Sequence, residues 1–206
     1  MSGPQLTIYT IGHSNHSAEA FISLLTRHRI EAVADVRSSP YSQFAPHFNR
    51  EPLKAHLQSA GIAYVFLGDE LGARRKERHC YLDGRVSYER VAREPLFLAG
   101  LGRVESGAQR YRLVLLCAEK DPLDCHRTIL VARQLVARGH RVTHILADGS
   151  VERHEASEAR LLQRLSLPEA DWFRSPSELL ELAYARQAEQ IAFVEAEQPQ
   201  HTVAVP

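Results

Sequence analysis

Cysteine is scarce in this sequence, with three residues among 206. So few cysteines, and an odd number of them, do not suit a small fold held together by disulfides; free thiols are typical of a reducing compartment. The first ten residues, MSGPQLTIYT, also lack the basic stretch and following apolar stretch of a secretory signal. We therefore expect a cytoplasmic protein whose thiols are free.

Long apolar runs, an excess of one charge and several common motifs are lacking as well. The apolar run from Leu113 to Ala118 is far shorter than the roughly 20 residues that span a bilayer. Lys plus Arg number 25 and Asp plus Glu number 25, so no net charge draws the whole chain to nucleic acid or membrane. The motifs GxGxxG, GxxxxGK(S/T), HExxH and GxSxG are not found. These absences argue against a membrane partner and against the common dinucleotide, P-loop, zinc-protease and hydrolase chemistries, and we expect no cofactor.

What the sequence does contain is an alternation of short apolar runs with segments of helical periodicity. Apolar runs predict five strands, over residues 6–11, 30–36, 62–67, 112–117 and 140–146. Helices are predicted after Ser17, around residues 53–57, over 88–105 with a break at Pro95, and over 128–137. The alternation predicts an α/β fold with an open, mainly parallel five-stranded sheet and helices on both faces. We expect the strand order 3-2-1-4-5, numbered along the chain.

The chain divides by composition into three parts. Residues 5–150 are expected to form the α/β domain. Residues 151–197 read as a helical appendage, with ten acidic against five basic residues. Residues 198–206 have little apolar content and are expected to form a flexible tail.

Polar side chains follow three of the predicted strands, where ligands bind in open α/β sheets. These side chains are His13 and Ser14 after the first strand, Asp35 and Arg37 at the end of the second, and Cys117, Glu119, Cys125, His126 and Arg127 after the fourth. We expect them to surround one crevice.

Cys125 lies where a helix is expected to begin, and the free backbone N–H groups there lower the pKa of a thiol. Cys125 is therefore the candidate nucleophile, with His13 or His126 as proton carrier and Glu119 to orient one of them. Ser14, Arg37 and Arg127 would hold an anion. The alternative is structural: Cys125 is a small buried thiol, Arg37 pairs with Asp35, and Arg127 pairs with Asp35 or Glu119.

A metal site is a weaker prediction. Cys117, Cys125 and His126 offer zinc ligands, but the chain has no Cys-x-x-Cys pair and a fourth ligand would have to come from His13 or His79. We therefore expect no metal. A redox pair of Cys117 with Cys125 is disfavoured in a reducing compartment.

The segment 71–93 is basic, with seven Lys or Arg and three Asp or Glu. Tyr81 and Tyr88 are interleaved with Arg74, Arg75 and the other basic residues, a pattern that suits single-stranded nucleic acid. The alternative is a mobile charged loop, which Gly68 and Gly72 could make a lid over the crevice.

Five stretches of the chain together resemble the domain of unknown function 488 family. These stretches are TIGHSN (10–15), ADVRSSPYSQF (34–44), LGDELGARR (67–75), DGRVSYERVA (83–92) and LLCAEKDPLDCHRTILVARQL (115–135). The resemblance extends over about residues 7–150 and implies an α/β domain, but no general activity. The matching positions are His13, Ser14, Asp35, Arg37, Pro40, Cys117, Glu119, Cys125, His126 and Arg127. Cys80 falls outside them.

Two functions follow from these residues. The first is an enzyme, a thiol-dependent hydrolase or transferase, that acts on a phosphorylated or nucleotide-like anionic ligand at the Cys/His/Arg site. The second is a binding module without chemistry, which holds an anion or nucleic acid with the same site and the basic segment 71–93. In a third interpretation Glu119, Arg37 and Arg127 form an ion-pair network that only holds the loops. The oligomeric state is not predicted.

Overall fold

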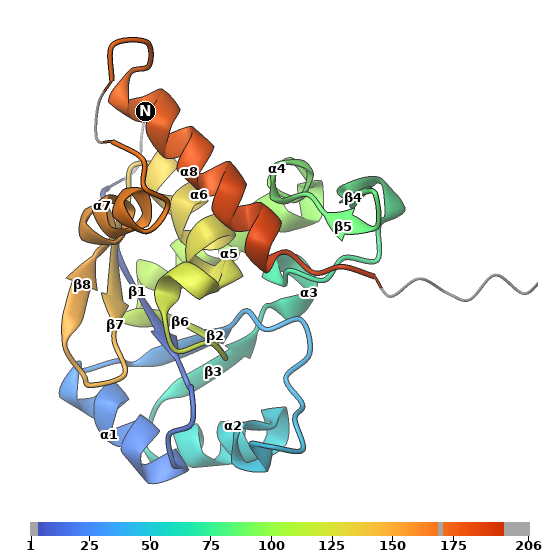
Figure 1. Cartoon of the computed structure of the whole chain (residues 1–206). Coiled ribbons are helices and arrows are strands. Elements are labelled where there is room, and N and C mark those ends of the chain that lie inside the picture. Colours follow the sequence, from blue (N-terminus) through green and yellow to red (C-terminus); the bar gives the residue numbers. More distant parts are fainter. Residues whose placement is uncertain (1–3, 169–170, 196–206) are drawn as a thin grey trace, which may run out of the picture.

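A six-stranded sheet lies at the centre of the protein (Figure 1), whose computed structural model describes residues 4–168 and 171–195. The strands are β1 (Thr7–Gly12), β2 (Ala32–Asp35), β3 (Ala63–Phe66), β6 (Leu113–Cys117), β7 (Arg141–Ile145) and β8 (Val151–Arg153). The first five are the predicted strands, and each pairs in parallel with its neighbours. β8 was not predicted, and it adds to β7 in the antiparallel direction. The fold is therefore an open α/β sheet, as expected, with one more strand.

The order of the strands differs from the prediction. The sheet runs β3-β2-β6-β1-β7-β8, so the expected order 3-2-1-4-5 is wrong. The fourth predicted strand, β6, pairs with β2 on one side and with β1 on the other. All five of its residues, LVLLC, are buried, which suits a central strand covered on both faces. The carboxyl end of β6 thus lies between those of β1 and β2.

Helices cover both faces of the sheet (Figure 1). Helices α1 (Ala18–Arg27) and α2 (Arg50–Ser59) contribute to the core on one face, together with alternate β6 residues Val114 and Leu116. The other face, with Leu113 and Leu115, packs against α5 (Pro95–Ala108), η4 (Arg127–Ala132) and α6 (Arg133–Ala137). The shorter elements are η1 (Pro46–Phe48), α3 (Gly68–Leu71), η2 (Arg78–Cys80), α4 (Tyr88–Val91) and η3 (Pro122–Asp124).

Local sequence signals account for several element boundaries. Ser17 begins α1, where its Oγ accepts a hydrogen bond from the N–H of Ala20 at 3.2 Å. Pro95 separates α4 from α5, as predicted, because it occupies the first turn of α5. A hairpin of β4 (Tyr81–Leu82) and β5 (Arg85–Val86) was not predicted, although Asp83-Gly84, both with positive φ, is a typical hairpin turn.

The C-terminal segment begins with β8 and continues as α7 (His154–Arg164) and α8 (Pro176–Ile191). The expected helical appendage is thus joined to the sheet by a strand. Ser175 and Glu178 form a capping box that starts α8. The expected tail, 198–206, lies outside the described residues. Among the described residues, none of the helices is long and apolar enough to cross a bilayer.

A chain of buried hydrogen bonds connects the sheet to these C-terminal helices. His144 lies between Thr10 Oγ1 at 2.8 Å and His154 Nδ1 at 3.1 Å. His154 Nε2 in turn lies 2.9 Å from the hydroxyl of Tyr184, which donates to Glu158 at 2.8 Å. Burial lowers the pKa of His154 to about 4 and that of His144 well below its usual value. Both imidazoles are therefore neutral at pH 7.

We expect these two histidines to make the fold sensitive to acid. An unfolded histidine binds its proton near pH 6.5, whereas folded His154 does so only near about pH 4. Between these values the unfolded state binds more protons, so the free energy of unfolding falls as pH falls and is fully retained above 6.5. For His154 alone the loss amounts to about 3 kcal/mol. Urea unfolding at pH 7 and near pH 4 measures it.

Two variants test this prediction. His154→Gln removes one titrating group from the buried chain and should reduce the difference in unfolding free energy between the two pH values. His56→Gln removes an exposed imidazole and should leave that difference as it is in the wild type. An unchanged difference in His154→Gln would contradict the prediction.

Candidate functional site

Three loops meet at the carboxyl ends of the central strands. The N–H of His13, after β1, donates to Cys117 O at 2.9 Å, and that of Ser14 donates to Ala118 O at 2.9 Å. On the other side of β6, the N–H of Val36 donates to Leu116 O at 3.0 Å. The parallel pairing of β6 with both neighbours therefore continues into the loops. It brings together the residues that follow the first, second and fourth predicted strands.

At this junction four donor side chains form a cluster, which we call the sulfur cluster: Cys117, Glu119, Cys125 and His126. Glu119 Oε2 lies 3.0 Å from Cys117 Sγ and 2.9 Å from Cys125 Sγ. His126 Nδ1 lies 3.6 Å from Cys117 Sγ and 3.9 Å from Cys125 Sγ. Both sulfur atoms and the imidazole are buried, whereas Glu119 is exposed.

Local structure fixes the two sulfur-bearing residues. Cys117 is the last residue of β6. Cys125 is extended, and its carbonyl oxygen accepts hydrogen bonds from the N–H groups of Thr128 and Ile129, so the helical segment begins there, as predicted. The following residues, η4, form a π-helix whose six residues are all buried. π-Helical turns are frequently found at functional sites.

The loop between the two cysteines is held by Asp121. Its carboxylate accepts hydrogen bonds from the N–H of Leu123 at 2.9 Å and from the guanidinium groups of Arg160 and Arg164. Burial would raise the pKa of Asp121, but the hydrogen bonds from Arg160 and Leu123 lower it to about 2. This anchoring fixes the distance between Cys117 and Cys125.

The two thiols differ in acidity. Burial would raise the pKa of Cys125, but the hydrogen bond from Cys117 and the charge of Arg127 lower it well below its usual value. Burial and the neighbouring Cys125 raise the pKa of Cys117. Partial burial and the same neighbour raise the pKa of Glu119. Cys125 is therefore the more acidic of the two thiols.

Arg37 is fixed at the end of β2 by Asp35. The Nε of Arg37 donates to Asp35 Oδ1 at 2.9 Å and its Nη2 to Oδ2 at 2.6 Å. The hydroxyl of Tyr64 also donates to Oδ2, at 2.9 Å. This ion pair is buried, as the structural alternative predicted for Arg37 and Asp35.

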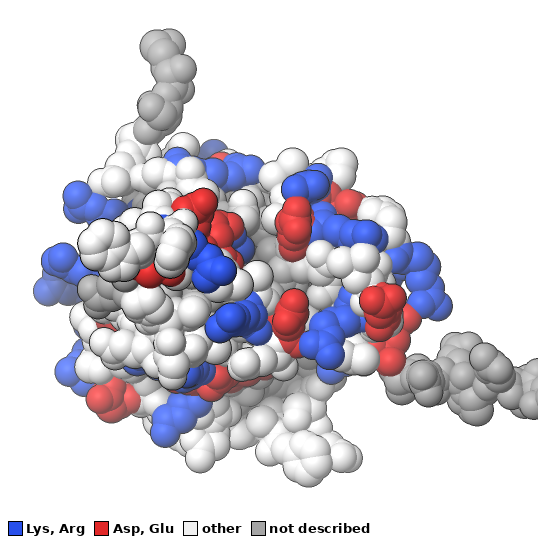
Figure 2. All heavy atoms as spheres, turned by 45° about the horizontal axis from the view of Figure 1, so that its top comes forward, with Lys and Arg blue, Asp and Glu red and all other residues white. Residues whose placement is uncertain are grey.

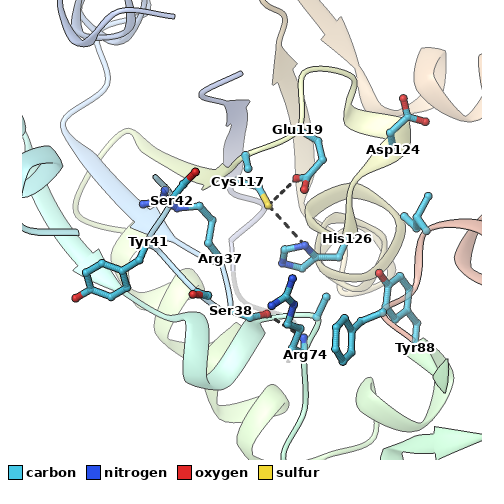
Figure 3. A pocket seen from close by; sticks show the side chains of 15 residues that line it. Arg37, Ser38, Tyr41, Ser42, Arg74, Tyr88, Cys117, Glu119, Asp124 and His126 are labelled. Atoms are coloured by element: carbon cyan, nitrogen blue, oxygen red, sulfur yellow. Dashed lines mark hydrogen bonds between the residues drawn. The ribbon is translucent and has the colours of Figure 1, made fainter. Parts of the chain in front are cut away.

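A pocket of about 360 Å³ adjoins the sulfur cluster. Its lining comes from the loop after β2, from the segment after α3, from the loop after β6 and from the end of α8: Arg37, Ser38, Ser39, Tyr41, Ser42, Ala73, Arg74, Tyr88, Cys117, Ala118, Glu119, Asp124, His126, Ile191 and Phe193. Figure 3 shows Cys117, Glu119 and His126 gathered at one end, with Arg37 beside them and Arg74 reaching up from the opposite end. The pocket thus combines guanidinium groups with the sulfur cluster.

Not every predicted catalytic residue faces this pocket. Glu119 and His126 line it, but Cys125 is 1% exposed and lies beside the wall, where the sulfur atom on the lining is that of Cys117. His13 also lies beside the pocket. Its ring stacks on Phe48 at 4.3 Å and burial lowers its pKa to about 4, so it is neutral at pH 7.

The predicted anion ligands divide in the same way. Arg37 and Arg74 line the pocket. Ser14 instead lies beside it, and its hydroxyl donates to Asn15 Oδ1 at 3.3 Å.

Arg127 and Arg75, which the sequence suggested as ligands of an anion or nucleic acid, are not among the residues that line the pocket. Arg127 is fully buried, and its Nη1 donates to the backbone oxygen of Glu119 at 2.7 Å rather than to a carboxylate. Arg75 is buried too, with its Nε on Glu77 and its Nη1 on backbone oxygens. Both groups hold loops in place through the donors that are paired, whereas Arg127 Nε and Arg75 Nη2 are buried without a partner among the described residues.

Part of the pocket escaped prediction. Ser38, Tyr41 and Ser42 follow the second strand within a motif already singled out, so their position near the sheet edge could have marked them. Ile191 and Phe193 come from the far end of the chain, and nothing in their local sequence indicates a pocket.

Within residues 4–168 and 171–195, two groups of side chains have the spacing to hold a metal ion. Ligand atoms of Cys117, Cys125 and His126 lie within 4.8 Å of one another, and so do those of His79, Cys80 and Glu94. The first group is buried and adjoins the pocket, whereas His79 in the second is exposed.

Comparison with known proteins bears on this part of the chain. The sequence model of the family described as "Domain of unknown function DUF488" matches residues 17–134. The chain belongs to this family. The match, which the motifs had suggested, contains all four residues of the sulfur cluster as well as Arg37 and Arg74. No curated protein and no solved structure matches the chain. DUF488 membership therefore places the site inside the family region, without naming an activity.

Proposed function

We propose that this DUF488 protein is an enzyme that binds a phosphorylated or nucleotide-like anion in the pocket and transforms it beside the sulfur cluster. One observation carries the proposal: guanidinium groups and a group of thiol, imidazole and carboxylate side chains line a single hollow. Guanidinium groups match the geometry of phosphate and carboxylate oxygens. A volume of about 360 Å³ lies within the range typical of small-molecule sites.

The two arginines retain donors for a ligand. Asp35 occupies Nε and Nη2 of Arg37, while Nη1 has no hydrogen-bond partner among the described residues. The guanidinium of Arg74 lies 4.7 Å from the centre of the Phe193 ring, and its backbone N–H is held by Ser38 Oγ at 2.9 Å. Arg74 is thus positioned by stacking and by its main chain, which leaves its side-chain donors available to an anion.

The proximity of the cluster favours catalysis over simple binding. Cys117, Glu119 and His126 belong to the same lining as the arginines, so a bound anion lies next to groups that can transfer protons or supply a nucleophile. A thiol-dependent hydrolase or transferase fits this arrangement. Cys117 and Cys125 are both free, as such an enzyme in a reducing, cytoplasmic setting requires.

The alternative of a nucleic-acid-binding module has less support. Arginines of the basic segment 71–93 are used within the protein: Arg75 pairs with Glu77, Arg78 with Glu195, and Arg93 with Glu89. Figure 2 shows Lys and Arg interleaved with Asp and Glu on the face it presents. This face therefore has no continuous basic track that could follow the phosphate backbone of a nucleic acid.

Arg74→Ala is expected to weaken anion binding. Loss of a charge-assisted hydrogen bond typically costs about 1.5–3 kcal/mol, so the Kd should rise roughly 10–100-fold. Isothermal titration with inorganic phosphate and with a nucleoside monophosphate measures the effect. The matched control is Arg93→Ala, an exposed arginine of the same segment that pairs with Glu89 away from the pocket lining.

The controls separate the two functions. Arg93→Ala should bind both anions as the wild type does. Failure of the wild type to bind either anion, or an equal loss in both variants, would contradict the pocket proposal. Salt-dependent binding of a single-stranded oligonucleotide without binding of the small anions would instead support the nucleic-acid module.

A further inference from the structure

Three donor atoms of the sulfur cluster lie close to one another, and the fourth lies beside two of them. Two sulfur atoms, an imidazole nitrogen and a carboxylate oxygen come from only ten residues of chain, Cys117 to His126, folded back by the loop that Asp121 anchors. The three buried ligand atoms lie within 4.8 Å of one another, and Glu119 Oε2 lies within 3.0 Å of both sulfur atoms. The two sulfur atoms and the imidazole nitrogen thus form a compact group of three donors, and the Glu119 carboxylate lies against the two sulfur atoms.

The distances from the imidazole nitrogen to the two sulfur atoms are close to those of a zinc site. Zn–S bonds of about 2.3 Å and Zn–N bonds of about 2.0–2.1 Å give S···N edges of about 3.5–3.6 Å. The observed distances from His126 Nδ1 to the two sulfur atoms are 3.6 and 3.9 Å. The S···O edges of 3.0 and 2.9 Å are shorter than those of a zinc site, by about 0.5 Å. Glu119 is exposed, so its carboxylate has room to move outward when an ion enters.

The orientation of His126 also points to a metal. Its Nε2 lies 3.0 Å from the backbone oxygen of Val36, which can only accept, so Nε2 carries the ring proton. When the ring is neutral, Nδ1 therefore presents a lone pair to the two sulfur atoms. Among the described residues, these sulfur atoms are the only hydrogen-bond partners of Nδ1, at distances that are long for a hydrogen bond. Metal-bound histidines almost always donate their second ring N–H to a carboxylate, a backbone carbonyl or a water molecule, and Val36 O is such an acceptor.

Charge and hydrogen bonding suit bound thiolates. The backbone N–H of Arg127 donates to Cys125 Sγ at 3.4 Å. The guanidinium of Arg127 is fully buried close by, on the backbone oxygen of Glu119. Two thiolates and one carboxylate bring three negative charges, which a divalent ion and this guanidinium balance. Without an ion, two buried sulfur atoms face one imidazole nitrogen.

We propose that Cys117, Cys125, His126 and Glu119 hold a zinc ion at the end of the pocket. Two thiolates with an imidazole select zinc over magnesium or calcium, which prefer oxygen ligands. The sequence disfavoured a metal for lack of a fourth ligand, and neither His13 nor His79 supplies it. Glu119, two residues after Cys117, does. Because Glu119 is the exposed ligand, it is the one that a substrate or water can replace, as in catalytic zinc sites.

The full-length protein, purified under reducing conditions and freed of metal with a chelator, is titrated with Zn²⁺ and separately with Co²⁺. We expect one equivalent of either ion to bind. The Co²⁺ form should show the visible bands of tetrahedral cobalt and the ultraviolet charge-transfer bands of cobalt–thiolate bonds. Saturating Zn²⁺ should raise the Tm by roughly 5–10 °C.

Matched cysteine variants locate the ion. Cys125→Ser and Cys117→Ser should each weaken Zn²⁺ binding by more than roughly 100-fold. Loss of a residue that only hydrogen-bonds to a metal ligand already weakens binding by roughly 10–100-fold. Cys80→Ser changes the third cysteine, which belongs to the other group with metal-binding spacing. This variant should bind Zn²⁺ as the wild type does. Glu119→Gln should keep the cobalt–thiolate bands and weaken binding to a lesser extent.

The cobalt spectrum of the wild type keeps the test decisive even if a cysteine variant does not fold. Three results would each overturn the zinc site. They are the absence of cobalt–thiolate bands, a Cys117–Cys125 disulfide in the protein purified under reducing conditions, and loss of the ion in Cys80→Ser alone. Zn²⁺ binding needs no anion in the pocket, so this proposal and the anion-binding proposal succeed or fail in separate measurements. With zinc bound, Cys117 and Cys125 are ligands and not free nucleophiles, so the zinc form would not use a thiol as its nucleophile.

Discussion

Gly12→Ala is expected to lower the free energy of unfolding by more than about 3 kcal/mol and to disrupt the site. Gly12 ends β1 beside Cys117, and a Cβ on it would lie 1.8 Å from the backbone oxygen of Glu119 and 3.0 Å from Nη1 of Arg127. The first contact is with main chain, which cannot rotate away as a side chain can. The loop after β6 would have to shift, and the Glu119 carboxylate with it. Urea unfolding and Zn²⁺ titration of the variant measure both effects.

Gly102→Ala is the matched control. Gly102 lies inside α5, and a Cβ there meets no atom within 4 Å. Because alanine favours a helix interior over glycine by up to about 1 kcal/mol, this variant should be as stable as the wild type or more so. If Gly12→Ala behaved like Gly102→Ala, the close contact between β1 and the Glu119 loop would be refuted.

Asp35→Asn is expected to be the second strongly destabilising change. It leaves the guanidinium of Arg37, which is 7% exposed, without its carboxylate partner. Removing one partner of a buried ion pair typically costs about 3–5 kcal/mol, because the remaining charge is neither solvated nor paired. The Tyr64 hydroxyl, which donates to the Asp35 carboxylate, would also lose its charged acceptor. Chemical denaturation at pH 7 measures the loss.

Two further variants show whether burial is the cause. Glu89→Gln breaks the exposed pair with Arg93 and should leave stability within experimental error, because exposed pairs contribute little. The double change Asp35→Asn with Arg37→Met removes the unpaired charge and should recover part of the lost stability. A loss in Asp35→Asn as small as that in Glu89→Gln would contradict the prediction.

Strand positions could be predicted because buried strands are apolar, whereas strand order could not. The apolar run LVLLC predicts the strand β6 from its composition alone. Whether it lies beside β2, β1 or both depends on the paths of distant crossovers, which leave no local signal. β8 escaped notice because its three residues, Val-Glu-Arg, are mostly polar at the edge of the sheet.

The site was predictable where its residues are close in sequence. Cys117, Glu119, Cys125 and His126 lie on a strand end, a short loop and a helix start, so their convergence follows from βα geometry. The direction of Arg127 was not predictable, since the chain turns it inward onto a backbone oxygen. The stacking of Arg74 on Phe193 joins residues more than a hundred positions apart and depends on where α8 ends.

The end of α8 has a consequence for how ligands are chosen. Ile191 and Phe193 form one wall of the pocket, yet they lie beyond residues 17–134, the region shared with the DUF488 family. The four donors and both guanidinium groups lie inside that region. Substitutions in the last turn of α8 can therefore alter the size and shape of molecules admitted while the reacting groups stay in place. In the proposed enzyme, the choice of ligand would thus depend in part on a segment outside the family match.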